Sequence, residues 1–76
     1  MSTQRQPVTT ASPTRVLAAQ RQARLQHYVL IHQWATVREL AAEFGTSPTT
    51  IRRDLDTLAA KGALLRVHGG AGAATG

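Results

Sequence analysis

The sequence predicts a mainly α-helical domain with a small β-hairpin. Two short helices carry clear start and stop signals and are joined by a tight turn that begins at Gly45. The second of them repeats Ile51, Leu55 and Leu58 at helical spacing, and a short apolar segment with two glycines follows it. Two helices joined by a glycine-bearing turn form a helix-turn-helix, and a hairpin after the second helix makes the winged variant, with three helices plus a wing.

Composition limits the kinds of protein this chain can be. Its 76 residues suffice for one small domain, and the absence of cysteine excludes disulfides and thiolate metal sites. No apolar run approaches the length of a membrane span, so no membrane partner is expected. The net charge is +5 and eight of the nine basic residues are arginine, whose planar fork suits phosphate and guanine edges. This balance favours a polyanionic partner, although it also fits a merely basic soluble domain.

The first helix is expected from Ser12-Pro13, an N-cap and first helical residue, to about Gln33. Residues 1–12 before it are polar and aperiodic, and we expect a disordered tail. The buried stripe of this helix should consist of residues at i, i+3, i+4 and i+7, widened by two further apolar residues. The stripe residues are Leu25, Tyr28, Val29 and His32, and the widening residues are Leu30 and Ile31.

The next helix should occupy about 37–44. Thr36 and Glu39 have the spacing of a capping box, in which each side chain satisfies a free backbone N–H group. Gly45 can adopt the left-handed conformation that ends a helix. The inner face of this helix should carry Val37, Leu40, Ala41 and Phe44. Residues 34–36, which precede the helix, have room for a very short strand.

The third helix is expected over 48–61, with Ser47 as N-cap, Pro48 as its first residue and Lys61-Gly62 at its end. Leu64 to Val67 then predict a short strand, and Gly69-Gly70 the tip of a hairpin. We therefore expect the domain to span 13–71 and residues 72–76 to be a truncated linker.

The outer face of the third helix is the candidate functional surface. Each helical residue advances about 100°, so with Ile51 inside, Thr49 and Arg53 lie on the opposite side and Arg52 flanks them. A recognition helix enters the major groove with its N-terminal residues towards base edges. A solvated face, with Arg52 and Asp56 paired at i and i+4, is the alternative. The candidate DNA-binding residues are Ser47, Thr49, Thr50, Arg52 and Arg53 of this helix, Arg38 of the helix before it, and Arg66, His68 and Gly69 of the wing at 66–70.

Two motifs at their proper separation indicate a family. "SPTTIRRDL" followed by "KGALLRVHGGA" resembles the N-terminal winged helix-turn-helix domain of the DeoR family of bacterial transcription regulators, over residues 21 to 71. The resemblance implies sequence-specific binding to a double-stranded DNA operator in the bacterial cytoplasm, at the nucleoid. It also implies a repressor of sugar or nucleoside metabolism, homo-oligomeric as a whole, with a sugar-phosphate-like effector bound by a C-terminal domain absent here. The chain departs from the family at Gln33, where a glycine often stands.

Other functions have weaker support in the sequence. His27 and His32 are five residues apart and point to different faces, so no metal site is expected, and no acid pair or phosphate-binding loop suggests an enzyme or a cofactor. A winged-helix protein–protein interaction module remains the alternative, disfavoured by the basic outer face of the third helix. RNA binding is weaker still, because three aromatic residues offer few surfaces for base stacking.

Overall fold

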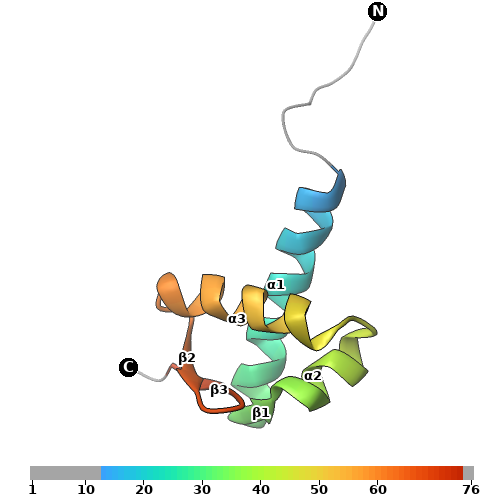
Figure 1. The fold of residues 1–76 in the computed structure, drawn as a ribbon. Coiled ribbons are helices and arrows are strands. Elements are labelled where there is room, and N and C mark those ends of the chain that lie inside the picture. Colours follow the sequence, from blue (N-terminus) through green and yellow to red (C-terminus); the bar gives the residue numbers. More distant parts are fainter. Residues whose placement is uncertain (1–12, 75–76) are drawn as a thin grey trace, which may run out of the picture.

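The computed structural model describes residues 13–74, which form three helices and a three-stranded sheet (Figure 1). The expected tail at 1–12, with the Ser12 cap, and residues 75–76 lie outside the described part. The elements follow in the order α1 (Pro13–His32), β1 (Trp34–Thr36), α2 (Val37–Phe44), α3 (Pro48–Ala60), β2 (Leu64–Val67) and β3 (Gly70–Ala73). The expected mainly α winged helix-turn-helix is therefore confirmed. No described helix is both long and apolar enough to cross a membrane.

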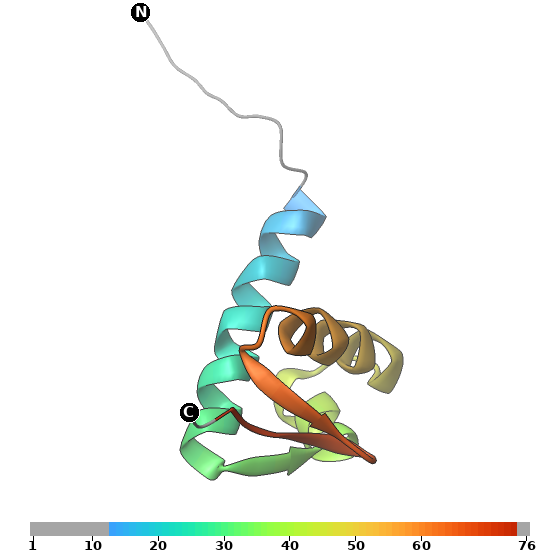
Figure 2. The ribbon, with the colours of Figure 1, turned by 90° about the vertical axis from the view of Figure 1, so that its left-hand side faces the viewer.

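The core forms where the lower half of α1 meets α2, α3 and the sheet, while the upper half of α1 extends beyond the other elements (Figures 1 and 2). Leu25 and Val29 of α1 are fully buried there, whereas Leu17 in the extending half is exposed. The remaining buried apolar residues come from every other element, as expected of a small domain with one core. They are Ala35, Val37, Leu40, Ala41, Ile51, Leu55, Leu58, Leu64 and Ala71.

The apolar face of α1 is narrower than its sequence predicts. Leu30 and Ile31 are more than half exposed and His32 is exposed too, so their assignment to the buried face is wrong. For Leu30 and Ile31 the reason is angular, because they lie about 100° and 200° around the helix from Val29, which faces the core. His32 lies only about 60° from Val29, and there angle alone does not explain its exposure. Tyr28 is half-buried, with its ring 4.1 Å from that of His32 and at 5.9 Å edge-on to Phe44.

The caps of α2 and α3 agree with the sequence. Glu39 N donates to Thr36 Oγ1 at 3.0 Å and Thr36 N to Glu39 Oε1 at 2.8 Å, which completes the capping box. Gly45 ends α2 in the left-handed region, with φ 61°. α3 ends at Ala60, one residue before the end that the sequence predicts. Lys61 is its C-cap, with right-handed backbone, and Gly62, with φ 76°, is the residue after the cap.

The wing hairpin of β2 and β3 is part of a three-stranded sheet. β3 lies between β1 and β2, antiparallel to both, with Ala35 opposite Ala71 and Val67 opposite Gly70. The tip is His68-Gly69, one residue earlier than expected, because Gly70 already pairs in β3. β3 also runs through Ala73, so two residues that we expected in the linker belong to the sheet.

Candidate nucleic-acid interface

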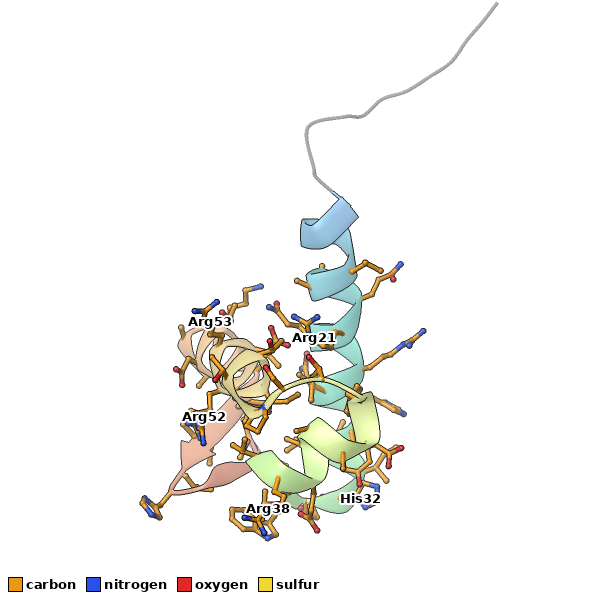
Figure 3. The ribbon with its side chains drawn as sticks, turned by 45° about the vertical axis from the view of Figure 1, so that its right-hand side comes forward. Arg21, His32, Arg38, Arg52 and Arg53 are labelled. Atoms are coloured by element: carbon orange, nitrogen blue, oxygen red, sulfur yellow. The ribbon has the colours of Figure 1, made fainter. Side chains whose placement is uncertain are left out.

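The third helix has the orientation that the functional prediction requires. Ile51 and Leu55 have no exposed surface and Leu58 is 4% exposed, so the aliphatic side of α3 faces the core. Thr49, Arg52 and Arg53 are exposed on its other side. In Figure 3, Arg52 points towards the wing and Arg53 lies on the opposite flank of α3. The first two turns of α3 therefore present two guanidinium groups and a hydroxyl to an incoming partner.

The hydroxyl groups at the start of α3 are not equally free. Ser47 Oγ accepts from Thr50 N at 3.1 Å and also donates to Thr50 Oγ1 at 3.1 Å. Because Ser47 caps the helix and Thr50 is half-buried, these two side chains hold the helix N-terminus in shape. Thr49 has neither role and is the hydroxyl most available to a ligand.

The expected alternative pairing of Arg52 with Asp56 does not form. Asp56 instead accepts from Arg66 Nε at 2.8 Å, across from α3 to β2. All four acidic residues of the chain lie in the described part, and none forms a salt bridge with Arg52 or Arg53. Both guanidinium groups are thus left for an anionic partner.

A notch of about 320 Å³ lies between α2, α3 and the wing. Arg38 of α2, Arg52 of α3 and Arg66 of β2 all line it, and no acidic residue does. The N-terminal ends of both helices, which carry the positive poles of their dipoles, also open onto it through Val37 and Pro48. The structure therefore brings together three arginines that are distant in sequence, in a space large enough for a phosphate group.

Hydrogen bonds to backbone carbonyl groups hold the wing in place beside α2 and α3. Arg66 Nη1 donates to the carbonyl oxygens of Val67, at 3.1 Å, and Gly70, while its Nε binds Asp56. The carbonyl of Gly69 accepts from Val37 N at 2.8 Å, which ties the tip to the start of α2. Arg66 therefore braces the hairpin, and His68 is the exposed side chain at its tip.

Sequence reasoning missed the main polar contact of α3. Asp54 is the one buried charged residue in the described part, at 3% exposed. It accepts from Arg21 Nε, from Arg21 Nη2 at 3.0 Å and from Gln22 Nε2 at 3.1 Å, all from α1. The hydrogen bond to Asp54 raises the pKa of Arg21 and outweighs the opposing desolvation. The available signal was the position of Asp54, only about 60° around the helix from Ile51.

The two histidines of α1, His27 and His32, do not line the notch. They lie at a groove between α1 and α2 that Arg24, Tyr28 and Phe44 also line. Among the described residues, no group of three or more His, Asp or Glu side chains could hold a metal ion.

Comparison with known proteins points to the same kind of domain. The sequence model of the DeoR-like helix-turn-helix domain matches residues 21–76. The HTH-type transcriptional regulator IolR of Bacillus subtilis (strain 168) is 39% identical over 46 residues, which are 60% of this chain and 18% of that protein. The glycerol-3-phosphate regulon repressor of Escherichia coli (strain K12) is 50% identical over 38 residues, 50% of this chain and 15% of that protein. The chain thus spans less than a fifth of these relatives, and no solved structure gives a significant match.

Proposed function

Since the chain belongs to the DeoR-like helix-turn-helix family, we propose that it binds a double-stranded DNA operator sequence-specifically, as the N-terminal domain of a transcription regulator. The observation that carries this proposal is the outer face of α3, where Arg52 and Arg53 are exposed and unpaired among the described side chains. In this arrangement α3 enters the major groove with its N-terminal turns foremost.

The two arginines have different roles in this proposal. Arg53 stands clear of the wing and reads a base edge, with guanine as the natural match for its fork. Arg52 lines the notch beside Arg38, so it binds a backbone phosphate instead. Thr49 is available for a phosphate oxygen or a thymine methyl group, and Ser47 and Thr50 shape the helix end that approaches the backbone.

The wing extends the interface. His68 and the backbone of Gly69 at its tip contact the phosphate backbone or the minor groove, while Arg66 contributes positive charge to the notch without leaving Asp56. One such domain covers one half-site, so the isolated chain binds as a monomer and weakly, and the complete regulator binds tightly as a homo-oligomer.

The relatives support a proposal for the wider biological role. One of them is named a glycerol-3-phosphate regulon repressor. By analogy, the regulator to which this domain contributes represses genes of sugar or nucleoside metabolism at the bacterial nucleoid. A sugar-phosphate-like effector would bind a C-terminal domain outside residues 1–76.

Titration of duplex DNA and of single-stranded RNA at several salt concentrations tests the proposal. With about three arginine–phosphate contacts, log K against log salt should fall with a slope of about −2.7, which is about a 40-fold loss of affinity between 50 and 200 mM. Arg52→Ala should reduce that slope by about one. Arg24→Ala is the control, because it also removes one positive charge, but from the groove between α1 and α2, and it should leave the salt slope unchanged. Equal affinity for both nucleic acids would reduce the proposal to non-specific binding of polyanions. No binding to either would favour the protein–protein interaction alternative.

A further inference from the structure

Asp54 is an unusual residue for the place it occupies. It immediately follows Arg53 in α3, yet its side chain points inward and is almost fully buried. A buried carboxylate is costly unless hydrogen-bonded donors surround it. Here Arg21 supplies two donors, one to each carboxylate oxygen, and Gln22 supplies a third. The two partners are 32 and 33 residues away along the chain.

The core already joins α1 to α3 without this contact. Leu25 and Val29 of α1 belong to the same buried cluster as Ile51, Leu55 and Leu58 of α3. Apolar contact is non-directional, so it favours close packing without specifying one rotation of a helix about its own axis. An arginine fork on a carboxylate has fixed planar geometry and defines both the distance and the rotation between its two helices.

Small rotations of α3 matter at its outer face. A rotation of about 15° displaces an atom at the helix surface, about 5–6 Å from the axis, by about 1.5 Å. That displacement exceeds the range of donor–acceptor distances over which a hydrogen bond to a base edge persists. A group that fixes the rotation of α3 therefore controls which base edge Arg53 can reach.

We propose that Arg21 and Gln22 are positioning residues that orient the recognition helix through Asp54, and that this contact determines base specificity more than it stabilises the domain. The inference rests on the proposed DNA binding. Buried ion pairs can often be replaced by apolar residues of similar volume without loss of stability, because their desolvation offsets their attraction. Specificity and stability should then separate in suitable variants.

The test uses the 76-residue chain, a duplex selected from a random pool, and a scrambled duplex of the same composition. Arg21→Met with Asp54→Leu replaces the pair by apolar side chains of similar shape and keeps the net charge. Arg24→Met with Glu43→Leu removes one cation and one anion from exposed positions at the α1–α2 groove and is the matched control. Urea unfolding and the ratio of the two dissociation constants are measured for each protein.

We expect the Arg21/Asp54 double variant to keep a near-native unfolding midpoint and the affinity for scrambled duplex, while its preference for the selected duplex falls at least tenfold. The control should keep the preference. A double variant that fails to fold would refute the claim that the contact contributes more to specificity than to stability. Arg21→Lys, which keeps the charge but not the fork, then tests the orienting role alone and should reduce the preference about threefold or more. A folded variant with undiminished preference would overturn the inference. A wild-type chain without any preference would instead refute the proposed function itself, and the inference with it.

Discussion

Replacing Gly70 by alanine should destabilise the domain far more than the same change two residues later. A Cβ atom at Gly70 would lie 2.9 Å from Thr36 Cα and 3.1 Å from the carbonyl carbon of Ala35, and closer still to the Ala35 carbonyl oxygen. Ordinary contact begins at 3.4 Å, so β1 and β3 must separate by more than 0.5 Å. All three neighbouring atoms belong to the backbone, which cannot move aside as a side-chain tip can.

The expected cost follows from that geometry. Overpacking of this kind costs about 1–3 kcal/mol, and the hydrogen bond from Val37 N to Gly69 O beside it is worth about 1 kcal/mol more. A total of about 2–4 kcal/mol is large for a chain of this size, whose stability at about 0.05–0.15 kcal/mol per residue is about 4–11 kcal/mol. With a urea m-value near 1 kcal/mol/M, the unfolding midpoint should fall by about 2–4 M.

Gly72→Ala is the matched control in the same strand. Its Cβ would meet only the Gln33 carbonyl oxygen at 3.6 Å, an ordinary contact, so the midpoint should hardly change. Urea unfolding followed by circular dichroism compares the two variants at equal concentration. Equal midpoints for Gly70→Ala and Gly72→Ala would refute the close approach of β1 and β3 on which the prediction depends.

Three further substitutions test other parts of the structure. Gln33→Gly should stabilise the domain by about 0.5–1 kcal/mol, because Gln33 has φ 70° and a side chain is strained there; an unchanged or lower melting temperature would contradict this. Ile51→Asp should unfold the domain by placing a charge in the core, whereas Ile51→Val should cost only about 0.5–1.5 kcal/mol, and far-ultraviolet circular dichroism distinguishes the two. Arg53→Ala should cost about 1–3 kcal/mol of binding to the selected duplex and relax base preference at one position; an equal loss on every duplex would make Arg53 a phosphate contact.

Features that depend on neighbours in the chain were predictable. The capping box of Thr36 and Glu39 and the left-handed Gly45 involve groups within four residues of each other, so residue type and spacing suffice to identify them. The inward side of α3 was predictable for the same reason, since helical periodicity fixes which residues share a face. Even the departure at Gln33 has a local meaning, because the backbone there has the positive φ that a glycine would adopt without strain.

Features that depend on distant partners were not predictable. The sequence offered Arg52 as the neighbour of Asp56 at helical spacing, but the folded chain brings Arg66 to it from β2. The exposure of Leu30 and Ile31 likewise depends on which side of α1 the other helices cover, and periodicity alone allowed a wider face. The close approach that requires Gly70 to be a glycine exists only once β1 has joined the sheet.

The sequence by itself determined where α2 and α3 begin, where α2 ends, which side of α3 faces the core, and the family to which the chain is similar, because these rest on local hydrogen bonding and periodicity. Only the tertiary structure decided that Asp54 binds Arg21 and Gln22 of α1 and that three separate arginines line one notch. Those contacts depend on how helices and strands pack against each other, and packing between distant segments is not encoded in the spacing of any single segment.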